Sequence, residues 1–115
     1  MSEPIIDKNA LREQFDGDPE LLQEVKAILE EDCPKRMEEA RLAIATSDPE
    51  GLARAAHSIK GAVSTLAAGP ARKVASQLEM LGKGGMLELA SSVIEELSVE
   101  LDRLFAELAN VKGFD

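Results

Sequence analysis

Apolar residues recur along most of the chain at steps of three and four, which is the period of an α-helix with one buried face. The clearest run comprises Leu52, Ala56, Ile59, Val63 and Leu66. The same period continues past this run on both sides. The pattern therefore predicts a chain built almost entirely of amphipathic helices.

Proline, glycine and acidic residues divide the pattern into five segments. We expect a short helix at about residues 7–15 and long helices at about 18–46, 49–68, 70–82 and 86–109. Asp18-Pro19 and Asp48-Pro49 each place a capping residue before a proline, a common way to begin a helix. Pro34 removes a backbone hydrogen bond but leaves the apolar period intact, so we expect a kink there.

Four long amphipathic segments joined by short turns predict an all-α fold, an antiparallel four-helix bundle with the short N-terminal helix packed against one end. In the fourth segment we expect Val74, Leu78 and Leu81 to face inward. With 115 residues, three Phe and neither Tyr nor Trp, the chain suits one domain (1–115) with an aliphatic core.

The net charge of −9 argues against binding to nucleic acid or to an anionic membrane surface. The charge is uneven, because residues 50–85 contain five basic and two acidic residues. This middle segment favours an anionic ligand or an acidic partner, unless the solvated helix faces differ by chance. The single cysteine and the lack of a signal-peptide pattern at the N-terminus predict a cytoplasmic protein.

The only histidine, His57, lies on a second stripe of the third helical segment, turned away from the apolar one. Lys60, Gly61 and Ser64 follow it at spacings that place all four on one face of a helix. Glycine inside a helix costs about 1 kcal/mol relative to alanine, so Gly61 needs a reason. We expect the missing side chain at Gly61 to leave space beside the imidazole, so that a large group can approach the ring.

Several kinds of site are excluded by residue type. One histidine and one cysteine cannot assemble a zinc site, and Arg54 stands where a di-iron helix would carry glutamate. There is no serine-nucleophile or phosphate-loop motif. The remaining candidate is His57 itself, because a neutral imidazole at cellular pH can attack phosphorus.

Two other residues complete this candidate chemistry. If the third and fourth helices are antiparallel neighbours, Glu79 and Lys83 come close to His57. Glu79 could then fix the imidazole tautomer, and Lys60 could pair with phosphoryl oxygens. Taken singly, each has an ordinary explanation: a packing or surface histidine, a solvated lysine and a surface glutamate.

The run His57-Ser58-Ile59-Lys60-Gly61, followed by Leu78-Glu79 and Gly82-Lys83, resembles the histidine phosphotransfer (HPt) domain family of two-component phosphorelays. It is especially similar to the phosphoacceptor domain of chemotaxis-type histidine kinases. The family usually has glycine ten residues after the histidine, whereas this chain has Ala67, with Gly69 two places later.

The resemblance implies a role for each matching residue. His57 accepts phosphate on its outer ring nitrogen, Lys60 stabilises the phosphoryl group, and Glu79 bonds the inner nitrogen. Gly61 leaves room for a docking receiver domain, and Lys83 matches a position that is often basic. The family binds no nucleotide and no metal of its own; the partner receiver supplies the aspartate and Mg²⁺.

We therefore expect a monomeric phosphocarrier, without catalysis of its own, that exchanges phosphate with response-regulator receivers and a histidine kinase or hybrid kinase. The surface that meets the partner should include Arg54, Ser58, Gly61, Ser64 and Lys83. Two alternatives remain: the phosphoacceptor domain of a larger histidine kinase, and a helical adaptor that binds receivers without being phosphorylated.

Overall fold

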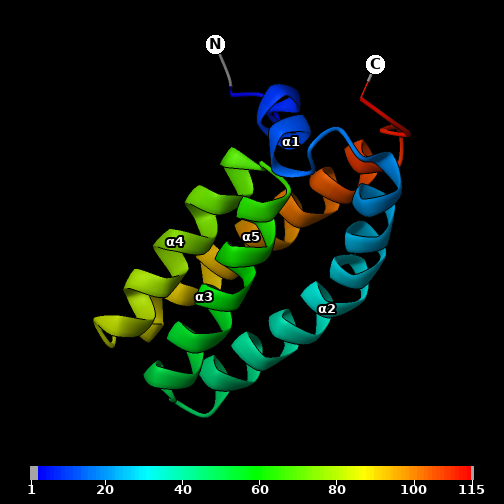
Figure 1. The fold of residues 1–115 in the computed structure, drawn as a ribbon. Coiled ribbons are helices and arrows are strands. Elements are labelled where there is room, and N and C mark those ends of the chain that lie inside the picture. Colours follow the sequence, from blue (N-terminus) through cyan, green and yellow to red (C-terminus); the bar gives the residue numbers. More distant parts are fainter. Residues whose placement is uncertain (1–2, 115) are drawn as a thin grey trace.

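The computed structural model describes residues 3–114, and within them the chain forms five helices and no strand. The helices are α1 (Lys8–Gln14), α2 (Pro19–Ala45), α3 (Pro49–Thr65), α4 (Gly69–Lys83) and α5 (Leu87–Leu108). The long helices pack in a closed sequence of neighbours: α2 against α3, α3 against α4, α4 against α5, and α5 against α2 (Figure 1). The predicted all-α class is confirmed for this part of the chain.

Aspartate side chains cap the first three helices. Asp7, Asp18 and Asp48 each accept hydrogen bonds from backbone N–H groups of the first turn that follows. Such a bond satisfies a donor that has no partner within the helix. The proline after Asp18 and after Asp48 costs no hydrogen bond, since that first position has no intrahelical partner. The starts of α2 and α3 are therefore encoded locally.

The end of α3 differs from the prediction. The helix ends at Thr65 instead of about residue 68, and Ala67 adopts a positive φ of 55°. This left-handed conformation reverses the chain, and the Ala68 N–H then bonds the Val63 carbonyl at 3.0 Å. Ala67 and Ala68 lie outside the helix, but both pack in or against the core. Their apolar character therefore extended the helical pattern in the sequence beyond the true end of α3.

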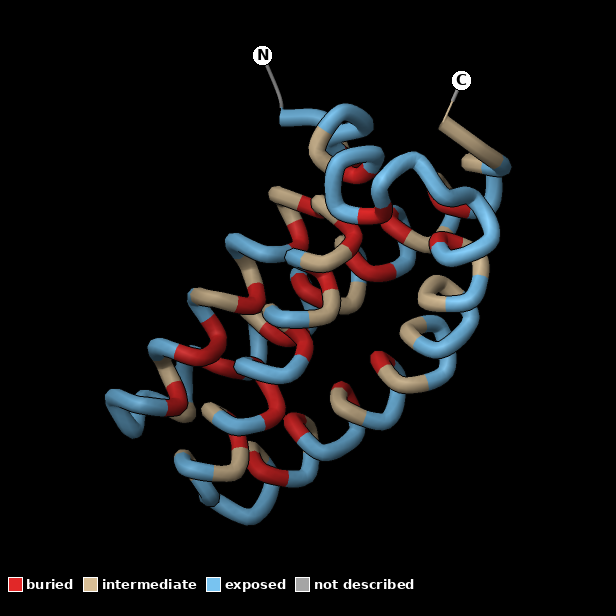
Figure 2. Tube along the Cα trace, viewed as in Figure 1, coloured by how far each residue is buried: buried red, intermediate tan, exposed pale blue. Residues whose placement is uncertain are grey.

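The core lies between the four long helices, where the inward turns of each helix are buried (Figure 2). The α3 stripe predicted from the period is fully buried, with no solvent exposure at Leu52, Ala56, Ile59, Val63 or Leu66. Cys33 is also buried in this core, and burial raises the pKa of its thiol to about 11. The aliphatic core predicted from composition is thus the observed one.

The inward face of α4 was predicted incompletely. Leu78 is fully buried, but Val74 and Leu81 are only partly buried, and the other buried positions are Ala71, Ala75, Glu79 and Gly82. We predicted that α4 ends at about Gly82, and it ends one residue later, at Lys83. A Cβ atom at position 82 would come within 2.7 Å of the Ala53 backbone nitrogen, so glycine permits a close approach of α4 to α3.

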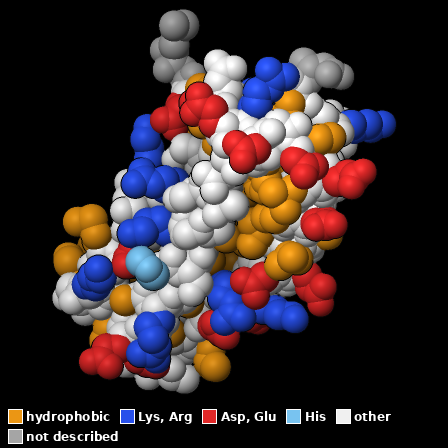
Figure 3. Space-filling view, in the orientation of Figure 1, with side chains coloured by type: hydrophobic (Ala, Val, Ile, Leu, Met, Phe, Trp, Pro, Cys, Tyr) orange, Lys and Arg blue, Asp and Glu red, His pale blue; other side chains and the backbone are white. Residues whose placement is uncertain are grey.

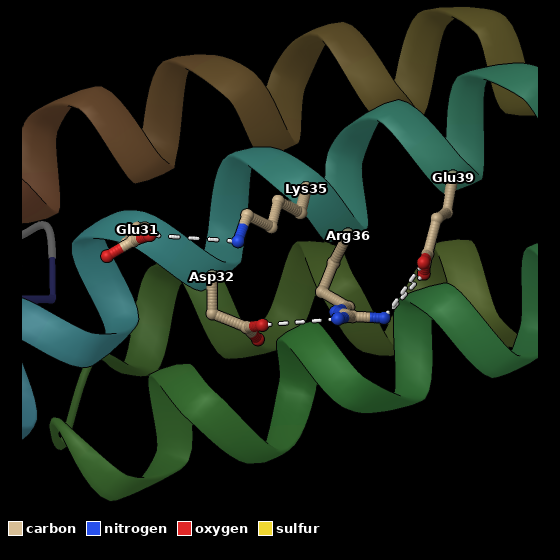
Figure 4. Close-up of polar contacts among 5 residues, drawn as sticks. All are labelled: Glu31, Asp32, Lys35, Arg36 and Glu39. Atoms are coloured by element: carbon tan, nitrogen blue, oxygen red, sulfur yellow. Dashed lines mark hydrogen bonds and ion pairs between the residues drawn. The ribbon is translucent and has the colours of Figure 1, made fainter.

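Helix α2 runs through Pro34 without a break, and its axis bends along its length (Figure 1). Two ion pairs link side chains four residues apart across the proline: Lys35 with Glu31 at 3.7 Å and Arg36 with Asp32 at 3.2 Å (Figure 4). Each such pair contributes about 0.2–0.5 kcal/mol. They strengthen the solvent face where Pro34 removes a backbone bond.

The short helix α1 lies at the end of the bundle where α3 turns into α4 (Figure 1). The Asp7 N–H donates to the Ala67 carbonyl at 2.9 Å, and Ile6, Leu11 and Phe15 are buried. The segment before α2 therefore covers one end of the core, as predicted for the N-terminal helix.

Candidate functional site

His57 lies on the solvent face of α3, near the middle of the helix. Its side chain is 68% exposed, and Figure 3 shows the imidazole protruding from the surface with basic side chains beside it. Leu52, Ala56 and Ile59 on the opposite face anchor the helix in the core. The helix thus presents the ring to solvent while its own position is fixed by packing.

Glu79 reaches this imidazole from α4. Its carboxylate Oε2 lies 3.0 Å from His57 Nδ1, and its side chain is only 6% exposed. An ionised carboxylate can only accept, so Nδ1 carries a proton, and in the neutral ring Nε2 then keeps its lone pair. The contact therefore selects the tautomer whose free nitrogen is the one remote from Glu79.

Two lysines bind the same carboxylate. Lys60 Nζ lies 2.6 Å from Glu79 Oε1, and Lys83 Nζ lies 3.3 Å from Oε2. The Lys60 side chain is 28% exposed, whereas that of Lys83 is 68% exposed. One buried carboxylate is thus held by a partly buried cation on α3, an exposed cation on its own helix, and the imidazole.

The pKa of Glu79 reflects these partners. It is lowered from 4.5 to about 2, chiefly by the hydrogen bond from Lys60, with smaller contributions from Lys83 and His57. Burial alone would raise the pKa of a carboxyl group, and here the hydrogen bonds outweigh it. Glu79 is therefore ionised throughout the physiological range.

Gly61 leaves the surface beside the imidazole open. A Cβ atom at this position would meet nothing within 4 Å, so no contact in the chain itself requires glycine. Ser58 and Ser64 are also exposed, and the Ser64 hydroxyl donates to the Lys60 carbonyl at 2.7 Å. In the predicted stripe, His57, Gly61 and Ser64 are thus exposed, whereas Lys60 is partly buried.

The remaining predicted residue, Arg54, lies one turn before His57 and is exposed. It lines a recess between the start of α3 and the end of α4, together with Lys83. Figure 3 shows basic side chains following this face of the molecule. The structure therefore brings Lys60, Lys83 and the imidazole together around Glu79, and it leaves Arg54, Ser58 and Ser64 as exposed residues that make no side-chain hydrogen bond or ion pair with the ring.

Sequence reasoning missed the burial of Glu79 and the role of Gly82 in bringing α4 close to α3. Glycine three residues after the glutamate was the available signal. Within residues 3–114 no group of three or more His, Cys, Asp or Glu side chains could hold a metal ion. No helix among these residues has both the length and the apolar character needed to span a membrane.

Comparison with protein families agrees with the geometry. The family model for the Hpt domain matches residues 24–110, from the first turns of α2 to just past α5. The chain therefore belongs to the Hpt domain family, whose members carry phosphoryl groups on histidine in two-component systems and interact with response regulators and kinases. Searches of curated proteins and of solved structures gave no match. Helix α1 lies outside the matched region.

Proposed function

We propose that this chain is a cytoplasmic, monomeric phosphocarrier that relays a phosphoryl group between His57 and the aspartates of receiver domains. The observation that carries the proposal is the exposed imidazole whose Nδ1 is bonded to a buried carboxylate. Such a ring offers the nucleophilic nitrogen to solvent and to any docking protein. The proposal includes an antiparallel four-helix bundle of α2 to α5 in one domain, which the contacts between successive long helices support.

The reaction follows from the tautomer. The lone pair of Nε2 forms the N–P bond while the P–O bond to the donor aspartate breaks, and that electron pair leaves with the aspartate carboxylate. Nδ1 keeps its proton, so positive charge develops on the ring during attack. The adjacent Glu79 carboxylate stabilises this charge, as the acidic member of a catalytic triad stabilises an imidazolium. The reverse step returns the phosphoryl group to a receiver.

Helix α3 offers a docking partner little obstruction. Gly61 is open, and Ser58 and Ser64 on the same exposed face are short, so another protein can approach the ring closely. The basic side chains on the same face would attract an acidic partner pocket. The chain itself holds no Mg²⁺ in this proposal, and kinase and receiver domains supply the catalysis.

Transfer from a phosphorylated receiver domain tests the proposal. The full chain should acquire a phosphoryl group that is stable in alkali and labile in acid, and His57→Gln should abolish it. Binding without any transfer would favour the adaptor. Label that persists in His57→Gln would refute the assignment of the site.

A further inference from the structure

The two lysines that contact Glu79 differ in how firmly they are held. Lys60 makes the shorter contact, 2.6 Å, and most of its side chain is covered, while Lys83 makes a 3.3 Å contact from a side chain that is 68% exposed. A short contact to a buried carboxylate is costly to give up, because the carboxylate would remain buried without its partner. A long, exposed contact is worth little.

The two oxygens of the Glu79 carboxylate have different partners. Oε1 accepts from Lys60, whereas Oε2 is shared by His57 Nδ1 and Lys83. If Lys60 leaves, no other cation among the described residues contacts Oε1. Lys83 can leave, because the imidazole N–H still occupies Oε2.

The family resemblance implies that Lys60 stabilises the phosphoryl group. The geometry points to different roles for the two lysines, an inference that rests on the proposed function. Lys60 is a positioning residue that holds Glu79 against the imidazole. Lys83 is the cation that moves to the phosphoryl oxygens on Nε2. The new phosphoryl dianion attracts a cation that is mobile and exposed. Lys83 is such a cation, on a flexible side chain one helical turn from Glu79.

The two roles differ in their dependence on Glu79. A residue that acts through the carboxylate loses its effect once the carboxylate is gone, whereas a residue that acts on the phosphoryl group keeps it. A double-mutant cycle on Glu79→Gln therefore separates Lys60 from Lys83. Lys73 provides a matched control, because it lies on the same helix, is 66% exposed and pairs with Glu3 at 2.8 Å.

The test uses the full chain and phosphoramidate, a small phosphoryl donor that needs no docking partner. Lys60→Met, Lys83→Met and Lys73→Met are compared in the wild-type and Glu79→Gln backgrounds, with phosphohistidine formation followed by intact mass. Lys83→Met should slow the reaction by about threefold to tenfold in both backgrounds, between the effect of an exposed ion pair and that of a charged hydrogen bond. Lys60→Met should slow it only where Glu79 is present, and Lys73→Met in neither.

A slowing by Lys60→Met that survives Glu79→Gln would overturn the inference, as would a Lys83→Met effect no larger than that of Lys73→Met. The ¹⁵N signals of the His57 ring give a second measurement on single variants, which decides the case if Glu79→Gln does not fold. They should shift strongly in Lys60→Met, be restored in Lys60→Arg and shift much less in Lys83→Met, which removes only the longer and more exposed contact to the carboxylate. The opposite pattern would contradict the assignment. Failure of wild type to form phosphohistidine would instead refute the proposed function.

Discussion

Gly82→Ala should destabilise the protein, whereas Gly61→Ala should stabilise it. A methyl group at position 82 would lie 2.7 Å from the Ala53 nitrogen, 3.0 Å from the Ala53 Cα and 3.0 Å from the Pro49 carbonyl oxygen. All three atoms belong to the α3 backbone, so no side-chain rotation relieves the contact. A methyl group at position 61 would touch nothing within 4 Å.

The pair of variants isolates the packing effect. Both substitutions gain up to about 1 kcal/mol of helix propensity, less at position 82 next to the end of α4, so most of this gain cancels when the two are compared. The difference in unfolding free energy should then equal the overpacking cost at position 82, about 1–3 kcal/mol. For a domain of this size that corresponds to a separation of melting temperatures of roughly 4–12 °C.

Thermal unfolding followed by far-ultraviolet circular dichroism, together with urea titration, measures this difference. Equal melting temperatures for Gly61→Ala and Gly82→Ala would refute the close approach of α4 to α3. Because this contact lies one turn from Glu79, the Gly82→Ala variant should also accept phosphate from phosphoramidate more slowly. Gly61→Ala should keep that rate, while bulkier residues at position 61 should slow transfer from a receiver domain.

Three further predictions concern stability. The pKa of Glu79 is lowered from 4.5 to about 2, so its stabilising effect is complete above pH 4.5 and lost as the pH falls towards 2. The stability difference between wild type and Glu79→Gln, measured by urea unfolding, should therefore shrink over this range; a constant difference would contradict the ion pairing. Asp48→Ala removes the α3 cap and should cost about 0.5–2 kcal/mol without changing phosphorylation of the folded protein by phosphoramidate. A slower rate would show that the cap also shapes the site. Ala67→Gly should raise the melting temperature slightly, because a left-handed alanine costs about 1–2 kcal/mol, partly offset by the freedom glycine gains on unfolding and by the loss of a methyl group that packs against the core. A lower melting temperature would count against that strain.

The sequence predicts best those parts of the fold whose causes are local. Helix periodicity identified the α3 stripe residue by residue, and aspartate followed by proline marked the starts of α2 and α3. The end of α3 was misplaced because Ala67 turns the chain without glycine, and alanine is otherwise a strong helix former. A turn of this kind depends on what packs around it.

The candidate site shows the same division. The exposed stripe through His57 and Gly61 follows from spacing within one helix. The burial of Glu79 does not, because it results from three positive or proton-donating groups meeting one carboxylate across two helices. How near α4 comes to α3 is set by the missing side chain at Gly82; the glycine is visible in the sequence, but a hydrophobic pattern does not show which helix it allows to approach.

The shared carboxylate also sets an electrical balance around the ring. Two ammonium groups and one carboxylate give the unphosphorylated site a net charge of +1, which favours the approach of an anionic group. Phosphorylation of His57 would add about −2 from the phosphoryl group and +1 from the retained ring proton, which would bring this cluster close to electroneutrality. The electrostatic attraction between this site and a phosphoryl donor would therefore weaken after transfer, which would help the two proteins to dissociate.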